Sequence, residues 1–234
     1  MKTNLLVLAS LILLNTTTFG CRTEGSGKTV TQVRQLETFS GIELKSAANI
    51  YVTQGDVQEV RIEAEDNLIE KISTKVKNNS LVVSDDDDIR YTKPVTIYIT
   101  VTDLCLLELT GSGNIVTRSQ FQCDFMNVKL SGSGDIRVMV NSKALKANLS
   151  GSGNLVLNGS SAETDYRISG SGNINARELN CFSSAVAISG SGTSTVDVKN
   201  DLNVTITGSG NVHYVHEPGK IASKIIGSGG ISKL

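Results

Sequence analysis

The sequence predicts an all-β protein built as a parallel β-solenoid, or β-helix, of about seven to eight coils. The first observation is a repeat: Gly-Ser-Gly starts at Gly111, Gly132, Gly151, Gly170, Gly190, Gly208 and Gly227, with spacings of 21, 19, 19, 20, 18 and 19 residues. The second is an alternation of apolar and polar residues around each copy. The third is the period itself, because about 19 residues hold short strands and corners but no helix in every repeat.

Each tripeptide lies between two alternating stretches. Between Val128 and Val138, the apolar residues Val128, Leu130, Ile136 and Val138 occupy every second position on either side of the glycines. A two-residue period is typical of strands with one buried face. Each repeat is therefore predicted to be a strand, a tight corner and a second strand, stacked so that all coils share one apolar core. A β-propeller with two periods per blade is the competing all-β prediction.

Glycine in the corners is explained by backbone conformation. A chain that reverses direction within a few residues visits positive φ, which costs a residue with a Cβ roughly 1–2 kcal/mol. The predicted structural corners are Gly111 and Gly113, Gly132 and Gly134, Gly151 and Gly153, Gly170 and Gly172, Gly190 and Gly192, Gly208 and Gly210, and Gly227 and Gly229. Asn or Asp follows most corners, and stacking at about 4.8 Å aligns such side chains. The predicted corner ladder is Asn114, Asp135, Asn154, Asn173 and Asn211, interrupted by Thr193 and Gly230.

Residues 32–234 are predicted to form a single domain, with an N-terminal cap over 32–103 and regular repeats over 104–234. In the cap, Ile42 to Val52 repeats the alternation with Ser46-Ala47-Ala48 in place of Gly-Ser-Gly, which predicts an atypical first coil. The rest is expected to be a small antiparallel meander that shields the edge of the solenoid. Its predicted elements are a strand over Val60–Ala64, a short helix over Asp66–Ile72 capped by Asp66, a hairpin over Lys75–Val83 turning at Asn78-Asn79, and a strand over Val95–Val101.

The first 20 residues have the pattern of a secretory signal peptide. Lys2 precedes an apolar run of 10 residues, Leu5 to Leu14, which is shorter than the roughly 20 residues of a membrane span. Cys21 follows Gly20 as in a lipidated bacterial precursor; Thr18 replaces the expected leucine, and ordinary cleavage at the same bond is the alternative. Residues 21–31 are predicted to be a flexible tether. We therefore expect an exported protein of the cell envelope, lipid-anchored at the outer membrane on its periplasmic or surface face.

Three further cysteines remain after Cys21. Cys123 and Cys181 both precede their Gly-Ser-Gly by nine residues, so they are predicted to lie three coils and about 14 Å apart, too far for a disulfide. Cys105 and Cys123 lie on adjacent predicted coils. They either pair as a disulfide or remain buried free thiols that act as small hydrophobic residues.

Few residues are grouped in a way that indicates chemistry. Asp85 to Asp88 form either a solvated loop, the favoured interpretation, or a Ca²⁺ site. His213 and His216 fall on opposite faces of an extended chain, and the corner serines have no paired base. We expect no catalytic, cofactor-binding or metal-binding residues. The formal net charge is −1, and no basic patch indicates a nucleic-acid partner.

Four segments precede the Gly-Ser-Gly-Asn-Ile repeats in a specific order: Phe39-Ser40-Gly41-Ile42, Ala48-Asn49-Ile50-Tyr51-Val52, Asp66-Asn67-Leu68-Ile69 and Asn79-Ser80-Leu81-Val82-Val83. Over about residues 30 to 230, this order resembles the head GIN domain family of putative autotransporter adhesins, exported and often lipid-anchored proteins of Bacteroidetes. The resemblance implies a β-solenoid and a surface or periplasmic location. It supplies no catalytic residues.

The expected function is that of a non-enzymatic, adhesin-like binding module whose strand faces or corner ladder contact a polymeric glycan, an envelope protein or a host protein. Weak contacts repeated along a rigid surface add through avidity. A structural or regulatory envelope scaffold is the alternative. A polysaccharide lyase or hydrolase is disfavoured, because carboxylates such as Asp165, Glu178 and Asp197 are scattered singly along the repeats.

Overall fold

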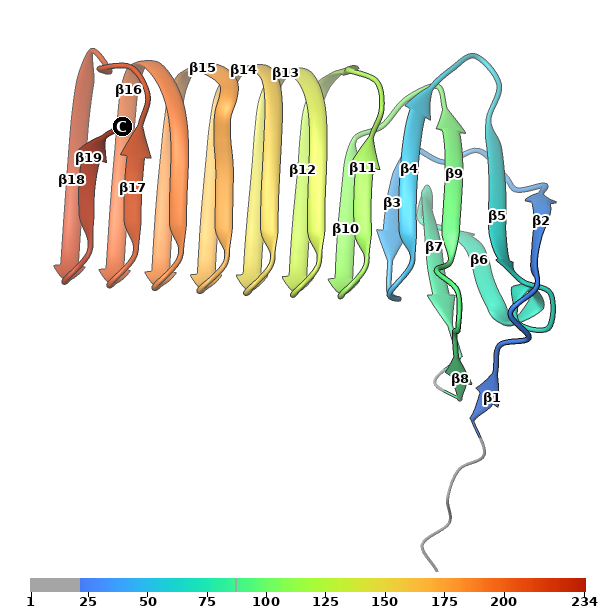
Figure 1. The fold of residues 1–234 in the computed structure, drawn as a ribbon. Helices are drawn as coiled ribbons and strands as arrows, with labels where there is room; N and C mark the ends of the chain where they lie inside the picture. The colour runs from blue at the N-terminus through green and yellow to red at the C-terminus, as the bar shows by residue number, and fades with distance from the viewer. Residues whose placement is uncertain (1–21, 87) are drawn as a thin grey trace, which may run out of the picture.

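The computed structural model describes residues 22–86 and 88–234, so the predicted signal peptide and Cys21 lie outside the described residues. A flattened parallel solenoid of about seven turns forms most of the molecule, and an antiparallel meander lies against its N-terminal end (Figure 1). The predicted fold class is thereby confirmed. The described part of the chain contains no helical segment with the length and hydropathy of a membrane span.

Each coil runs up one face of the solenoid, crosses an upper ridge and descends the opposite face to a lower corner (Figure 1). In the middle coils the strand continues across the ridge. The solenoid strands are β3 (Gly41–Leu44), β4 (Asn49–Gln54), β10 (Leu106–Gly111), β11 (Asn114–Thr117), β12 (Phe121–Gly132), β13 (Asp135–Gly151), β14 (Asn154–Gly170), β15 (Asn173–Gly190), β16 (Thr193–Gly208), β17 (Asn211–Tyr214), β18 (Lys220–Gly227) and β19 (Gly230–Lys233).

The coils pair in parallel and in register, which excludes the propeller. Equivalent positions of successive repeats face one another, as in the column Leu107, Val128, Ala147, Tyr166, Val186 and Val204. These side chains are almost completely buried between the two faces, in one continuous core of Ile, Leu and Val. The predicted atypical first coil is also confirmed, because Ile42 pairs with Leu107 and Ile50 pairs with Ile115.

The two glycines of a corner have different roles. Gly151 has a φ of 121°, in the region that favours glycine, and Gly153 has no such φ. A Cβ at Gly153 would instead lie 2.2 Å from the carbonyl oxygen of Gly134 in the preceding coil. The expectation that both glycines serve positive φ was therefore wrong for the second glycine, which serves close stacking alone. The first serves both, because a Cβ at Gly151 would lie 2.4 Å from the carbonyl oxygen of Gly132.

The meander packs on the first coil. Its elements are β1 (Thr23–Glu24), β2 (Thr29–Arg34), β5 (Glu59–Glu65), a 3-10 turn (Ile69–Lys71), β6 (Ile72–Lys77), β7 (Ser80–Asp85), β8 (Ile89–Arg90) and β9 (Thr96–Val101). β5 pairs antiparallel with both β2 and β9, whereas β7 and β9 join β3 and β4 in parallel. The predicted hairpin between β6 and β7 is confirmed, with Asn78 and Asn79 at φ values of 49° and 62° in the turn.

The predicted short helix is wrong. Only Ile69–Lys71 form a single 3-10 turn, preceded by Leu68 rather than capped by Asp66. The connection between β5 and β6 is too short for a stable helix, because helix nucleation is unfavourable. The carboxylate of Asp66 instead accepts a 2.6 Å hydrogen bond from Ser26 Oγ and lies 3.5 Å from Lys28 Nζ.

The described part of the predicted tether is ordered structure rather than a flexible segment. Thr29–Arg34 form β2. The residues that precede β2 are held in place by Glu65, which is fully buried. The Glu65 carboxylate accepts hydrogen bonds from the Gly27 amide (2.7 Å), the Thr92 amide (2.9 Å) and the Thr92 hydroxyl. A buried carboxylate needs such donors, and the N-terminal segment supplies one of them.

Candidate binding surfaces

The corner ladder lies on one face, directly above the lower corners. The structure aligns Asn114, Asp135, Asn154, Asn173, Thr193 and Asn211 in one column. The Asn154 amide donates to Asp135 Oδ1 at 2.9 Å, the Asn173 amide donates to Asn154 Oδ1 at 3.1 Å, and the Asn114 amide donates to Asn49 Oδ1 at 2.8 Å. These amides therefore already bond to one another, which leaves fewer donors and acceptors for a partner.

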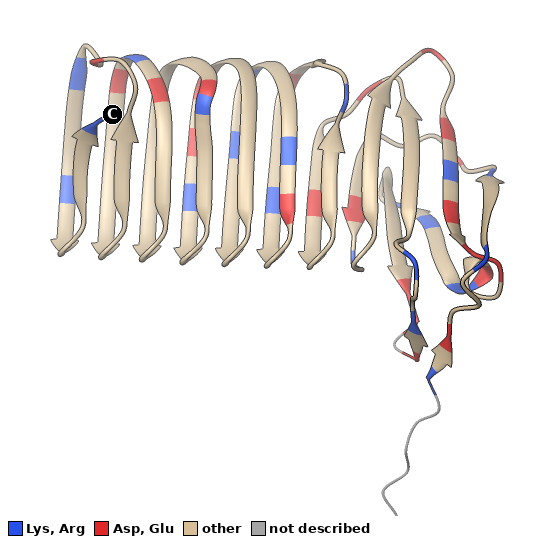
Figure 2. Cartoon of the chain, viewed as in Figure 1, with Lys and Arg blue, Asp and Glu red and all other residues tan. Residues whose placement is uncertain are grey.

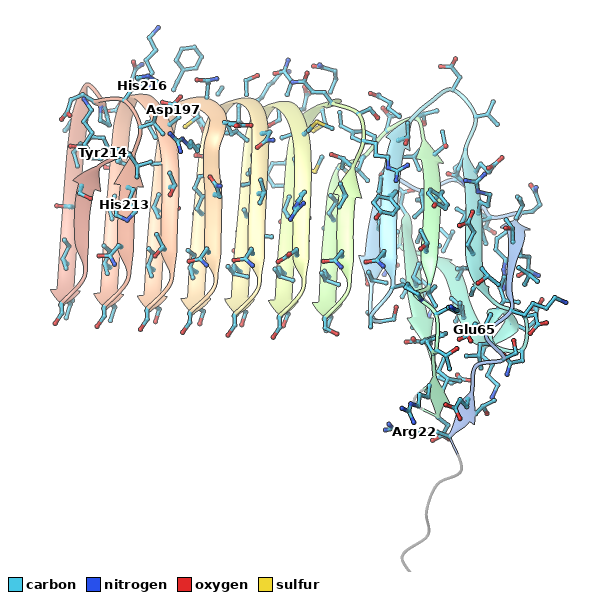
Figure 3. The ribbon with its side chains drawn as sticks, in the orientation of Figure 1. Arg22, Glu65, Asp197, His213, Tyr214 and His216 are labelled. Carbon is cyan, nitrogen blue, oxygen red and sulfur yellow. The ribbon has the colours of Figure 1, made fainter. Side chains whose placement is uncertain are left out.

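A second column of polar side chains follows the upper ridge. Strand register aligns Asn141, Ser160, Asn180 and Asp197, one on each of four successive coils. His216 extends the column, because its Nδ1 lies 2.8 Å from Asp197 Oδ1 (Figure 3). Ser160 Oγ donates to Asn141 Oδ1 at 2.9 Å, whereas the Asn180 side chain makes no hydrogen bond within the described residues. This column thus keeps free hydrogen-bonding capacity.

A groove of about 580 Å³ runs along the ridge beside this column. We call it the ridge groove and define it by Asn141, Asn180, Phe182, Asp197, Lys199 and His216. Strand alternation builds it: Asn180 and Phe182 point outward on either side of the buried Cys181. The Phe182 ring is 54% exposed and lies 5.7 Å from Lys199 Nζ. The groove therefore has a polar wall and an aromatic wall.

The floor of the ridge groove consists of small, uncharged groups. The Ser142 hydroxyl donates to Ser161 Oγ at 3.0 Å, and register places both in one column with Cys123 and Cys181. The predicted three-coil separation of these cysteines is confirmed. Burial raises the pKa of the Cys181 thiol to about 11, so this thiol is protonated at neutral pH and is a poor nucleophile.

Cys105, Cys123 and Cys181 are free thiols in the structure, so Cys105 and Cys123 are not joined. The expectation of burial is wrong for Cys105, which is exposed and whose Sγ lies 3.3 Å from Ser40 Oγ. Cys105 immediately precedes β10, in the connection that leaves the cap, and this connection runs over the surface.

An aromatic cluster marks the outer face of the cap. Tyr51 and Tyr98 are stacked with their ring centroids 5.7 Å apart. The guanidinium of Arg118 lies 4.0 Å from the Tyr51 centroid, and that of Arg61 lies 4.6 Å from the Tyr98 centroid. The chain's own cations thus already contact these rings, as Lys199 contacts the Phe182 ring at the longer distance of 5.7 Å.

The face opposite the corner ladder carries a second cavity of about 600 Å³. Its charged groups pair locally: Lys129 Nζ lies 3.1 Å from Glu108 Oε2, and Arg167 forms two hydrogen bonds with Asp165. Figure 2 shows charges of both signs scattered along the solenoid and none on the Gly-Ser-Gly corners. No broad surface of a single charge is visible in this view.

Other residues singled out from the sequence do not converge. His213 Nδ1 lies 2.9 Å from Ser232 Oγ on the side of the solenoid, while His216 lies on the ridge (Figure 3). Asp85 ends β7 and Asp88 precedes β8; Asp87 is not among the described residues. Within the described ranges, no group of three or more His, Cys, Asp or Glu residues is placed to hold a metal ion.

Sequence reasoning missed the ridge column, although one regularity marks it. Asn141, Ser160 and Asn180 precede the next Gly-Ser-Gly by ten residues, and Asp197 and His216 precede it by eleven. The residue types differ from coil to coil, so only this offset of ten or eleven residues relates them. The ridge bend also lacks the glycine pair that marks each lower corner.

The fold and these surfaces define a class: an elongated, repetitive β-solenoid with an N-terminal cap and grooves along its length. The profile of the family described as "Putative auto-transporter adhesin, head GIN domain" matches residues 38–218, and the chain belongs to this family. No protein with a curated description matches the sequence.

Solved structures share the fold. A "putative adhesin" from Bacteroides fragilis is 25% identical, with a TM-score of 0.84 over 91% of this chain and 100% of the other. A "putative lipid binding protein" from Parabacteroides distasonis is 23% identical, with a TM-score of 0.77 over 91% and 99% of the two chains. A "putative adhesin" from Parabacteroides merdae is 19% identical, with a TM-score of 0.70 over 91% and 98%. The last two comparisons describe the fold alone.

Proposed function

We propose that this protein is a non-enzymatic binding module of the cell envelope. The observation that supports this most directly is the in-register stacking of coils, which repeats one surface position at each step along the solenoid. A partner with its own repeat, such as a polymeric glycan or a repetitive envelope or host protein, makes similar weak contacts several times, and these contacts add through avidity. The adhesin names of the family and of the Bacteroides fragilis neighbour support the same function.

The chemistry of the surface also favours binding over catalysis. Asp165 pairs with Arg167 at 3.1 Å and Asp197 pairs with His216 at 2.8 Å, so both carboxylates already have partners within the chain. The buried Cys181 thiol is protonated at neutral pH. Rigid, regular surfaces of this kind suit recognition.

The binding function is tested with the mature protein immobilised on a solid support. Labelled envelope polysaccharide, envelope protein and host matrix fractions are passed over it, with urea-unfolded protein as the control. We expect saturable retention of at least one fraction by the folded protein alone. Equal retention by the unfolded control, or none by either, contradicts the proposal.

We further propose that the chain is exported and lipid-anchored at the outer membrane through Cys21. The apolar leader before Cys21 supports this, because such a leader directs export and a cysteine in this position accepts lipid. Growth with a clickable fatty acid should label the wild type and not Cys21→Ser. Equal labelling of both proteins contradicts lipidation at this residue.

A further inference from the structure

The ridge groove places a largely exposed aromatic ring next to a side-chain amide. Phe182 is 54% exposed in the middle of the array, and the Asn180 side chain, two residues earlier, has no hydrogen-bond partner within the described residues. An exposed aromatic ring in a groove is costly in water, and it offers a flat surface for an apolar ligand face. The Asn180 amide adds both a donor and an acceptor.

The charges of the groove select against an ionic ligand. Its lining includes Lys199 and the carboxylates of Asp197 and Glu217, and His216 bonds to Asp197. Cation and anions thus occur together, and the floor of Ser142 and Ser161 is neutral. A polyanion would meet carboxylates and a polycation would meet Lys199, so an uncharged ligand rich in hydroxyl groups fits best.

The shape of the groove indicates a chain rather than a compact molecule. The groove spans several coils, and its polar side chains recur once per coil, at the strand spacing of about 4.8 Å. Its volume of about 580 Å³ is that of a typical site for a small ligand. Sugar rings joined in a linear chain present hydroxyl groups at a similar interval and an apolar C–H face that packs on aromatic rings.

We propose that the ridge groove binds an uncharged linear oligosaccharide along the solenoid axis, with one sugar ring packed on Phe182 and its hydroxyl groups bonded to Asn180 and to the Asp197–His216 pair. This inference rests on the proposed binding function and assigns it a site and a ligand class. The corner ladder, whose amides bond to one another, is then a structural feature rather than the recognition surface.

The probes are four uncharged tetrasaccharides, with β-linked glucose, mannose, xylose or N-acetylglucosamine units, and one anionic tetragalacturonate. Titration calorimetry on the mature protein should detect binding of at least one uncharged probe and weaker or no binding of the anionic one. Phe182→Ala and Asn180→Ala should each weaken that binding roughly tenfold. Amide resonances of residues 180–182 and 197–199 should shift on addition of the sugar.

Phe125→Ala is the matched control, because Phe125 is 48% exposed and lies outside the ridge groove. It should retain the wild-type affinity. The substituted side chains are exposed, so thermal melts should show that all variants fold. Binding by no uncharged probe, stronger binding of tetragalacturonate, or undiminished affinity in both groove variants overturns the inference. If one of these results is found while the wild-type protein still retains envelope or matrix fractions, the proposed function stands and only the assignment of the ridge groove is wrong. If the wild-type protein retains no fraction, both the proposed function and the site are contradicted.

Discussion

At the scale of single residues, the glycines of each corner allow adjacent coils to stack closely, and the second glycine does so without a positive φ. Gly153→Ala places a Cβ 2.2 Å from the Gly134 carbonyl, and a backbone atom cannot move aside as a side chain does. We expect a loss of about 1–3 kcal/mol in the free energy of unfolding, measured by urea denaturation. Ser152→Ala, at the exposed position of the same corner, should change it by less than about 0.5 kcal/mol. Equal stability of the two variants contradicts this account of the corner.

Ser194 is a polar residue in an apolar column. It pairs in register with Ile174 and Val212, is fully buried, and its hydroxyl has no partner within the described residues. Ser194→Ala should therefore raise the free energy of unfolding by about 1 kcal/mol, because an unbonded buried hydroxyl is costly. Ser142→Ala should lower it by a similar amount, because that hydroxyl bonds to Ser161. Chemical denaturation of both variants tests the predicted opposite signs.

Glu65 makes the N-terminal segment sensitive to acid. Hydrogen bonds from the Thr92 side chain, and then from the backbone amides of Thr92, Gly27 and Lys93, lower its pKa from 4.5 to about 2 despite burial. A lowered pKa in the folded state means that the ionised group stabilises the fold above pH 4.5, and this stabilisation is lost as the pH falls toward 2.

The glutamine variant tests this pH dependence. Glu65→Gln should melt at a lower temperature than the wild type at pH 7, and the difference should shrink as the pH approaches 2. The exposed Glu163→Gln is the control and should follow the wild-type curve. A constant difference between Glu65→Gln and the wild type across this range would show that the carboxylate does not act through ionisation.

At the scale of elements, strands with a regular alternation of apolar residues were predicted correctly. Segments whose conformation depends on contacts distant in sequence were not. The alternation around Ser46-Ala47-Ala48 identified the first coil without glycine, because inward-facing residues must match those of the next coil. The prediction of a helix over Asp66–Ile72 was wrong because Asp66 bonds to Ser26, forty residues away in sequence, instead of capping a helix. The ordered N-terminal segment was missed for the same reason, since its partner Glu65 is distant in sequence.

The ridge groove was harder to predict than the corners. A corner requires glycine because of φ or of close stacking, so its residue type is fixed and visible. A ridge position requires only a polar side chain that can face solvent, so different coils carry Asn, Ser, Asp or His there. Whether such residues form a groove depends on the register between coils and on the exposure of Phe182. Neither can be predicted from the sequence period alone.

At the scale of the whole molecule, the two ends of the solenoid differ. The meander covers the first coil, whereas β18 and β19 pair with the preceding coil only (Figure 1). On β18 the core-register residues Ile221 and Ile225 are 37% and 40% exposed, while their neighbours Leu202 and Ile206 are fully buried. An open strand edge beside apolar surface invites pairing with another chain.

Lysine on this terminal coil opposes such pairing, because stacking two like ends would bring ammonium groups together. Lys224 lies on β18, opposite Thr205 of the preceding coil. Lys224→Thr should therefore self-associate at lower concentration than the wild type in sedimentation velocity, and added salt should promote association of the wild type by screening the charge. Lys146→Thr removes the same charge from β13, whose edges are both paired, and should behave like the wild type. Association of neither variant would mean that the exposed end is protected by its shape rather than by its charge.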